Sequence, residues 1–385
     1  MKKKFMLVLS LLLVMSLLFT ACTPQSKPAE EEKPAEEAVE KTDEKEEAEK
    51  PSEEERQEEA DKEDDEQRDA AAANFEGRTL NVVATSEAYV PLFEKFTEKT
   101  GAKVEFLSMS SGEVLSRVKA ESGKPMADLW FGGGLDAFIQ AKDDSLLEAY
   151  KSSNAEDVDA KFKDTEGYWY AKGITVVGLL VNNDVLEEKG LEAPKGWKDL
   201  ADPKYKDEVI MSSPAISGTN YAALKGWLDL WGEEEGWDFF TALNENIPAY
   251  GKRGKDPFEK TIAGEFAIGI IPADKSAHDA MEEENVTLIF PEEGIPWVPE
   301  GVAIFKGSDN VDIASAFIDF MYEAESQKMI ADIDGKDTNQ LVKPGAEGFD
   351  LGLDATKLIE EDLSTFGSAR EAILEKFQGI AGDKQ

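Results

Sequence analysis

Short apolar strands and amphipathic helices alternate along this chain from residue 79 onward. The segment 79–84 (TLNVVA) predicts a strand, 89–100 (YVPLFEKFTEKT) predicts an amphipathic helix ending at a glycine, and 103–106 predicts the next strand. A strand at 128–131 (DLWF) is followed closely by a helix over 135–143. Because such short connections join the elements, the pattern predicts an α/β fold in which helices cover the faces of a sheet.

Two further apolar runs predict buried strands that cross between two parts of the fold. They are 174–181 (ITVVGLLV) and 301–305 (GVAIF), and the chain between them predicts strands at 208–211 and 266–271. A chain that leaves one α/β lobe and later returns to it predicts two α/β lobes joined by a hinge. Ligands of such folds bind in a cleft near the carboxyl ends of the strands.

The charge and the rare residues exclude several classes of function. The 385 residues include 42 Lys and Arg against 81 Asp and Glu, which gives a net charge of −39. We expect no nucleic-acid partner, because that affinity comes from basic residues that neutralise phosphates. One Cys excludes a disulfide framework, and one His excludes metal sites that need several imidazoles.

Catalytic motifs are also missing from the sequence. It contains no Walker or dinucleotide fingerprint and no nucleophile elbow. An exported hydrolase would need a nucleophile–base pair, and His278 is the only imidazole that could serve as the base. We interpret His278 as a surface or capping residue, and we expect a protein that is not an enzyme and that has no resident cofactor or metal.

The amino terminus has the form of an export signal. Three lysines at 2–4 precede an apolar run at 5–19, which as a helix would span about 22 Å, less than the roughly 30 Å hydrocarbon core of a membrane. Such a segment predicts a secretory signal peptide over residues 1–21. The only cysteine of the chain, Cys22, follows directly.

The residues before Cys22 resemble the lipobox of bacterial lipoproteins, in which cleavage before the cysteine leaves its thiol and amine to carry lipid. That family usually has Leu three residues before the cysteine, where this chain has Phe19. The resemblance implies lipidation at Cys22 and a protein held on the extracellular or periplasmic face of a membrane without a spanning helix. A signal cleaved elsewhere, or a signal anchor with an incidental cysteine, is the alternative.

An acidic segment of low complexity follows. Residues 23–73 contain 22 acidic and 8 basic residues and no aromatic residue. Such a composition cannot bury enough apolar surface to offset its ordering entropy, so we expect a disordered tether over residues 22–77. A solvated helix over 52–73, or a tail that binds a partner, remains open.

These observations define the expected domain organisation. We expect a signal peptide at 1–21, a tether at 22–77 and a two-lobed α/β domain at 78–385, with lobe 1 at about 78–177 and 302–385 and lobe 2 at about 178–301; the family resemblance given below implies that this is a solute-binding domain.

Three strand–helix junctions have small residues at a helix amino terminus, where backbone N–H groups are unpaired and the helix dipole is positive. Two junctions belong to the first lobe and one to the second, so together they predict an anion held from both sides. The alternative is that these residues only cap helices. The first junction has Ser111 and Gly112, the second has the run Gly132–Gly134, and the third has Ser217, Gly218 and Thr219.

Other residues could contribute to the same cleft. Lys252, in the loop KRGKDP, would reinforce an anion site, although basic loops are usually just solvated. The aromatic run 168–170 and Trp297 would line either the cleft or the core.

The order and spacing of four segments resemble the extracellular solute-binding proteins of ABC importers, in the type II periplasmic-binding-protein group. The resemblance runs from about residue 80 to 333, and the branch includes receptors for ferric iron, thiamine, 2-aminoethylphosphonate and hexose phosphates. It implies two α/β lobes that close around one solute, and delivery to a membrane permease driven by a cytoplasmic ATPase. The segments are SSGEVLSRVKAESGKPMADLWFGG (110–133), GWKDLADPKYKDEVIMSSPAISGTNY (196–221), AGEFAIGI (263–270) and FPEEGIPWVPEGVAIFKGSDN (290–310).

The resemblance also implies ligand contacts at Ser86, at Ser111 and Gly112, at Gly133, and at the helix start from Ser217 to Thr219. Ferric receptors of this family carry two adjacent tyrosines, and none of the eight tyrosines here is adjacent to another. We therefore expect a monomeric receptor for a small anion, such as a phosphonate or a sugar phosphate. Ferric iron, or a cationic polyamine or thiamine, is the alternative.

Overall fold

The computed structural model describes residues 74–121 and 124–384. The expected signal peptide, Cys22 and nearly all of the tether, including the open helix at 52–73, lie outside these residues. No helix within the described ranges combines the length and the apolar character needed to cross a membrane.

The first lobe begins with parallel strands, as the alternation of elements predicts. Strand β1 (Thr79–Ala84) lies between β2 (Lys103–Ser108) and β3 (Leu129–Gly134). Helix α2 (Val90–Thr100) ends at Gly101, whose φ of +72° is left-handed and therefore suits glycine. The next two helices are α3 (Ser111–Ala120) and α4 (Leu135–Asp143).

Two long antiparallel strands connect the lobes. Strand β5 (Tyr170–Asn182) is buried along its whole length and pairs with β9 (Trp297–Phe305) in its first half. In its second half β5 pairs with β7 (Ile268–Pro272) and β8 (Val286–Ile289). Both strands are longer than the apolar runs predict, because β9 extends back to Trp297, which lies opposite Val176.

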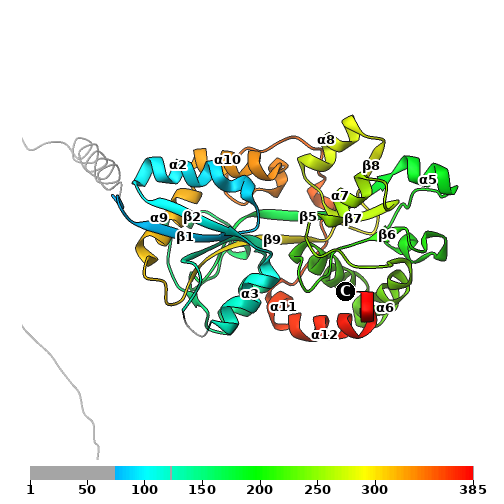
Figure 1. Ribbon diagram of the computed structural model, residues 1–385, viewed down its shortest axis with the longest axis horizontal. Helices are drawn as coiled ribbons and strands as arrows, with labels where there is room; N and C mark the ends of the chain where they lie inside the picture. Colours follow the sequence, from blue (N-terminus) through cyan, green and yellow to red (C-terminus); the bar gives the residue numbers. More distant parts are fainter. Residues whose placement is uncertain (1–73, 122–123, 385) are drawn as a thin grey trace, which may run out of the picture. The chain divides into compact units, whose positions relative to one another are not determined.

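One continuous sheet therefore spans both lobes, in the order β2-β1-β3-β9-β5-β7-β6, and Figure 1 shows β5 running from one lobe into the other. The remaining strands are β4 (Leu147–Glu148), which pairs with β9, and β6 (Val209–Ile210), which pairs with β7.

Helices cover the second lobe around this shared sheet. The longest, α6 (Gly218–Asn246), is two helices joined at Gly232, which has non-helical backbone angles. The others are α5 (Asn183–Lys189), α7 (Asp256–Ile262) and α8 (Lys275–Glu283).

After β9 the chain returns to the first lobe, where α9 (Val311–Met321) and α10 (Ala324–Asp334) lie on the same face of the sheet as α2, and α3 lies on the other (Figure 1). Aromatic side chains fill both layers. Phe93 of α2 packs edge-on against Phe131 of β3, and on the other face Trp130 stacks on Phe138 of α4 at 3.9 Å between ring centroids. This packing holds the loops at the ends of β1 and β3 on a rigid base.

The carboxyl-terminal segment corrects the expected lobe boundaries. Helix α11 (Leu363–Ser368) packs on α4, but α12 (Arg370–Ala381) packs on α6 of the second lobe. The Phe377 ring lies 5.8 Å from that of Phe240 and 5.1 Å from that of Tyr250, measured between centroids. The expected assignment of all of 302–385 to lobe 1 is therefore wrong for α12, because its apolar face is buried against α6.

Short 3₁₀ helices complete the fold. They are Glu87–Tyr89, Ser153–Ala155, Ala160–Phe162, Lys198–Ala201, Pro203–Tyr205, Thr338–Gln340, Ala355–Lys357 and Gly382–Lys384.

Candidate functional site

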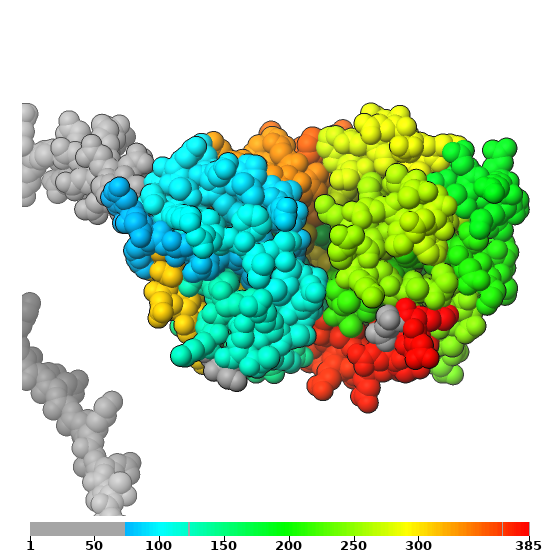
Figure 2. Space-filling view, in the orientation of Figure 1, coloured from blue at the N-terminus to red at the C-terminus, as the bar shows by residue number. Residues whose placement is uncertain are grey.

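The three predicted junctions meet at the boundary between the lobes. A Cβ atom built on Gly218, the first residue of α6, would lie 2.6 Å from the Cα of Gly134, the last residue of β3. A Cβ on Gly112 would lie 2.2 Å from the carbonyl oxygen of Ala215. The start of α3 and the end of β3 are thus in direct backbone contact with the segment that begins α6. In the space-filling view a narrow furrow separates the cyan atoms of the first lobe from the yellow-green atoms of the second (Figure 2).

The glycines at the end of β3 allow this close approach. Gly132 and Gly133 have φ angles of +88° and +105°, which disfavour any residue with a side chain. A Cβ on Gly133 would lie 2.7 Å from the Cβ of Ser111, and one on Gly132 would lie 2.7 Å from the hydroxyl of Thr85. The backbone after β3 therefore lies against both the start of α3 and the loop after β1.

Serine hydroxyls lie at the second-lobe side of the junction. Ser217 is the N-cap of α6, and its Oγ accepts hydrogen bonds from the backbone N–H and the side-chain amide of Asn220, so the hydroxyl hydrogen of Ser217 is left over. The Oγ of Ser213 is buried and has no hydrogen-bond partner in the described part of the chain. The sequence analysis singled out Ser217 but not Ser213, because a serine in a loop gives no sign of how deeply its hydroxyl will be buried.

On the first-lobe side, Ser111 is 4% exposed, and within the described residues its hydroxyl makes no hydrogen bond. The structure thus brings Ser111, Gly112 and Gly133 together with Ser217 and Gly218.

The two other predicted contact residues border this cluster. Ser86 follows Thr85 directly, and its Oγ accepts a hydrogen bond of 3.1 Å from the backbone N–H of Ala88, which caps the short helix Glu87–Tyr89. Thr219 is half-buried at the second position of α6.

The basic loop before α7 lies next to the start of α6. A Cβ on Gly254 would lie 3.8 Å from the Oγ of Ser217. Arg253 in this loop forms ion pairs with Asp256 and Glu259. Lys252 is exposed, and no carboxylate within the described residues forms an ion pair with its ammonium group. Of these two side chains, Lys252 is therefore the one whose charge is available to a solute.

A buried ion pair beside Gly134 escaped the sequence analysis. Asp136 of α4 is 1% exposed, and its Oδ2 accepts a 2.6 Å hydrogen bond from Nε of Arg370. Arg370 also donates to the carbonyl oxygen of Ala215 in the second lobe. Burial raises the pKa of the Asp136 carboxyl, although the charge of Arg370 opposes this shift. No local pattern could reveal a contact between residues so far apart in the sequence.

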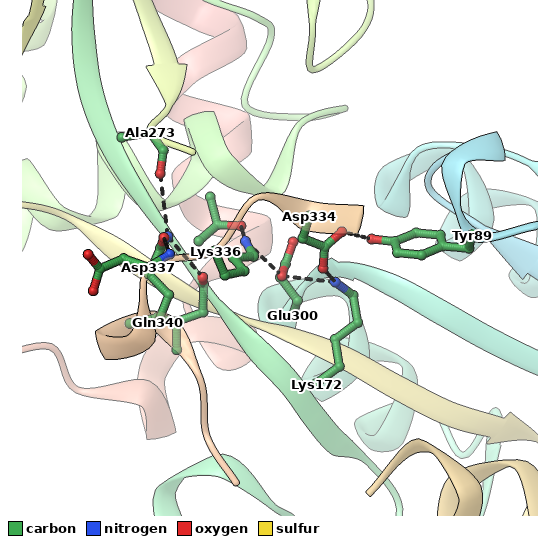
Figure 3. Close-up of polar contacts among 10 residues, drawn as sticks. Tyr89, Lys172, Ala273, Glu300, Asp334, Lys336, Asp337 and Gln340 are labelled. Carbon is green, nitrogen blue, oxygen red and sulfur yellow. Dashed lines mark hydrogen bonds and ion pairs between the residues drawn. The ribbon is translucent and has the colours of Figure 1, made fainter. Parts of the chain in front are cut away.

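A second buried network ties the hinge strands together (Figure 3). Lys172 of β5 has no exposed surface and forms ion pairs with Glu300 of β9 and with Asp334 at the end of α10. Lys336 pairs with the same Glu300 carboxylate at 3.1 Å, and the Tyr89 hydroxyl donates to Asp334 at 2.6 Å. The four charges therefore compensate one another.

This network lies next to the glycine run at the end of β3, since a Cβ on Gly132 would come within 3.5 Å of the Lys172 side chain. Burial disfavours the charged form of Lys172, but the neighbouring carboxylates still raise the pKa of its ammonium group well above the ordinary value. Burial also disfavours ionised Glu300, yet Lys172 and Lys336 hold the pKa of its carboxyl well below the ordinary value.

The remaining candidates lie elsewhere. Trp169, Tyr170 and Trp297, left open as cleft or core residues, are buried core residues, and the indole of Trp297 donates to the carbonyl oxygen of Ile359. His278 is half-buried on α8, where burial lowers its pKa.

Side chains suited to iron are engaged or dispersed. Within the described residues no three His, Cys, Asp or Glu side chains lie close enough together to hold a metal ion. Seven tyrosine hydroxyls donate to oxygen atoms of the protein itself: those of Tyr89, Tyr150, Tyr170, Tyr205, Tyr221, Tyr250 and Tyr322.

Comparison with known proteins gives consistent results. Residues 124–347 match the model of the family described as bacterial extracellular solute-binding protein. An uncharacterized protein of Haemophilus influenzae is 34% identical over 322 residues, which cover 80% of this chain and 92% of that one. A protein of Sinorhizobium fredii, named as a probable ABC transporter periplasmic-binding protein, is 32% identical over 58% of this chain and 64% of its own length.

Among solved structures, the periplasmic binding protein AfuA of Actinobacillus pleuropneumoniae, with exogenous fructose-6-phosphate bound, is similar to this chain with a TM-score of 0.74. The two sequences are 32% identical, and the match covers 79% of this chain and 99% of AfuA. The expected type II periplasmic-binding-protein fold with two lobes is thereby confirmed.

Proteins of this kind are exported, non-enzymatic components that deliver small solutes to a membrane permease. The matched family model, the relatives and the two-lobed fold agree: this chain belongs to the bacterial extracellular solute-binding proteins and is the substrate-binding protein of an ABC transporter.

Proposed function

We propose that this receptor captures a small anion with a phosphate or phosphonate group, such as a sugar phosphate, in the furrow between its lobes. The observation that carries the proposal is the approach of the amino termini of α3 and α4 to that of α6, where Gly112 contacts Ala215 and Gly134 contacts Gly218.

Helix amino termini suit an anion for two reasons. The first N–H groups of a helix have no intrahelical acceptor, and the helix dipole places partial positive charge at the same end. Here Gly218 and Thr219 begin α6, and Ser111 and Gly112 begin α3 on the opposite lobe. An anion between them would receive hydrogen bonds from both lobes, which would favour the closed form.

The serine hydroxyls add donors of the right kind. Ser217 uses its oxygen lone pairs on Asn220 and keeps its hydrogen free, and Ser213 and Ser111 have no hydrogen-bond acceptor within the described residues. A phosphate oxygen accepts from hydroxyls as readily as from N–H groups. The exposed ammonium of Lys252 would add charge at the rim.

The pairing of the nearby carboxylates argues against a cationic solute such as a polyamine or thiamine. Asp136 is paired with Arg370, and Glu300 is paired with Lys172 and Lys336. A cation bound here would share each carboxylate with a basic side chain that already compensates its charge. Engagement of the seven tyrosine hydroxyls likewise disfavours ferric iron, because phenolate ligands would first have to give up their hydrogen bonds.

The similarity to AfuA supports a phosphorylated solute. AfuA was solved with fructose-6-phosphate bound. It shares 32% sequence identity with this chain over 79% of its length, so the likeness extends beyond the fold to the sequence.

Isothermal titration of the full chain tests the proposal. The ligands are 2-aminoethylphosphonate, hexose phosphates, inorganic phosphate and Fe(III), and we expect saturable binding of at least one phosphorylated or phosphonate anion. Ser217→Ala should weaken that binding at least about tenfold, which corresponds to about 1.4 kcal/mol. Ser153→Ala is the matched control, because Ser153 is exposed and is not one of the residues of the proposed anion site. No binding of any anion by the wild-type protein would overturn the proposal.

We also infer that lipid on Cys22 anchors the receptor as a monomer on the outer face of the cell membrane. A signal-like segment directly before the only cysteine supports this inference, as does membership in an exported family. Cells fed with radioactive palmitate should label the wild-type protein and retain it in the membrane fraction. Cys22→Ser should abolish the label and release the protein, and a labelled Cys22→Ser variant would contradict the inference.

A further inference from the structure

A cavity of about 600 Å³ lies against the hinge strands and shares no residue with the junction described above. Its walls include Ile174 of β5, Trp297 of β9 and Phe162 from the 3₁₀ helix before β5. The segment that leads to α11 closes it with Leu358, Glu360, Glu361 and Leu363, among others.

Two aromatic rings in this cavity are arranged to face a cation. The rings of Phe162 and Trp297 lie 6.1 Å apart between centroids and are inclined at 73°. The ammonium of Lys161, an exposed residue, lies 4.8 Å from the centroid of Phe162 and 5.8 Å from that of Trp297. Aromatic faces attract ammonium groups at such distances. The pair thus already attracts an alkylammonium group, supplied by the protein itself.

A carboxyl group in the same wall has an oxygen without a hydrogen-bond partner in the described part of the chain. Oε1 of Glu361 accepts from the backbone N–H of Trp297 at 3.2 Å. Its Oε2 is buried and has no hydrogen-bond partner in the described part of the chain. Lys225, whose charge acts on Glu361, is already paired with Asp229. A buried acceptor left unpaired costs free energy, which a ligand with an N–H group would recover.

We propose that this cavity is a second ligand site, which binds a small primary alkylammonium ion. The ammonium group donates to Oε2 of Glu361 and faces the rings of Phe162 and Trp297. The alkyl chain packs on Ile174 and Leu358. Once Glu361 is ionised in the complex, Glu360 and Glu361 outnumber Lys161 among the charged residues of the wall.

The ionisation of Glu361 adds a measurable signature. Burial, reinforced by the charge of Asp229 and opposed by Lys225, raises the pKa of the Glu361 carboxyl well above its ordinary value. Glu360 and Lys161 are the other charged residues in the lining of the cavity. A cation bound at Oε2 favours the ionised form, so binding releases a proton, and the heat of binding depends on the ionisation enthalpy of the buffer.

Isothermal titration of the full chain with n-butylammonium, in two buffers of different ionisation enthalpy, tests the site. We expect saturable binding with a buffer-dependent heat, and no binding of butan-1-ol, which has the same chain without the charge. Glu361→Gln should weaken binding at least tenfold and abolish the buffer dependence, whereas Glu371→Gln, at an exposed carboxylate of α12 outside the cavity wall, should leave the affinity unchanged. Lys161→Met should strengthen binding, because it removes the competing ammonium.

A second variant tests the same site if the Glu361→Gln protein does not fold. Phe162→Leu keeps the cavity apolar but removes one aromatic face, and it should weaken n-butylammonium severalfold. Absence of saturable binding to the wild-type protein, or equal affinity in wild type and Glu361→Gln, would overturn the proposal. Ser217→Ala should leave n-butylammonium binding unchanged, so this site and the anion site between the lobes fail or succeed independently.

Discussion

Gly134 and Gly218 touch across the boundary between the two lobes: a Cβ on Gly218 would come within 2.6 Å of the Gly134 Cα, and one on Gly134 within 2.8 Å of the Gly218 Cα. Real Cβ atoms do not approach other atoms so closely. The contact therefore requires glycine on both sides, and it sets how closely the amino termini of α3, α4 and α6 can approach one another when the lobes are closed.

Gly218→Ala should hold the lobes apart. The added methyl group would meet the backbone of Gly134, which cannot move out of the way as a flexible side chain could. We expect solute affinity to fall at least about tenfold by titration calorimetry, with a more open particle by X-ray scattering in the presence of solute.

The matched control is Gly379→Ala on α12, where nothing lies within 4 Å of the new methyl group. This control should bind solute like the wild-type protein. Wild-type affinity in Gly218→Ala would show that the Gly134–Gly218 contact is unimportant for closure.

Ser213→Ala should separate stability from binding. The Ser213 hydroxyl is buried without a partner, so its removal should leave the free energy of unfolding unchanged or raise it. Solute affinity should nevertheless fall, because in the proposed site this hydroxyl donates to the bound anion. Urea denaturation and titration calorimetry measure the two effects.

Ser217→Ala should behave differently from Ser213→Ala. It removes the N-cap of α6 and should cost about 1 kcal/mol of stability as well as solute affinity. If Ser213→Ala destabilised the protein as much as Ser217→Ala does, the hydroxyl of Ser213 would have a structural partner after all.

Lys172→Met should be strongly destabilising. The substitution leaves the buried carboxylates of Glu300 and Asp334 with too little positive charge, and breaking one partner of a buried pair typically costs about 3–5 kcal/mol. Lys103→Met breaks an exposed pair with Glu105 and should cost less than about 1 kcal/mol. Thermal unfolding of both variants provides the comparison, and similar melting temperatures would argue against a stabilising network at the hinge.

The contribution of Glu300 should depend on pH in a defined direction. Its folded pKa lies below the ordinary value of 4.5, so its stabilising effect is complete above about pH 4.5 and is lost as the pH falls through the folded pKa. The difference in free energy of unfolding between wild type and Glu300→Gln should be constant near neutral pH and shrink below about pH 4.5. A difference that grows toward acid would reverse the sign of the proposed pKa shift.

Fe(III) should produce no phenolate-to-iron absorption band. Burial raises the pKa of Tyr221 and Tyr322, and both hydroxyls donate to backbone carbonyl groups, so neither is ready to ionise. Absorption spectra recorded during Fe(III) titration check this expectation. A visible band that Tyr221→Phe or Tyr322→Phe removes would restore the ferric alternative.

Features encoded over a few residues were predicted well. The strand at 79–84 and the helix at 135–143 have the predicted bounds, because the period of the apolar residues and the glycines beside them act locally. Ser217 was predicted at the start of a helix for the same reason, and it is the N-cap of α6. The ends of β5 and β9 were predicted less well, since cross-strand pairing extends each strand beyond its apolar run.

Contacts between distant residues could not be predicted. Asp136 and Arg370 lie 234 residues apart, and each alone resembles an ordinary surface residue of a helix. Helix α12 belongs to the second lobe because Phe377 packs against Phe240 and Tyr250. No local sequence pattern encodes this contact.

The sequence by itself determined the two-lobed α/β class, the family resemblance and the small residues at the helix starts, because periodicity, capping and glycine placement are local properties. Only the tertiary structure decided that Gly134 touches Gly218, that the buried charges are compensated, and which serine hydroxyls remain without partners. Those facts depend on which surfaces pack together when the chain folds. Burial and electrostatic pairing arise from tertiary contacts and are not properties of any single residue.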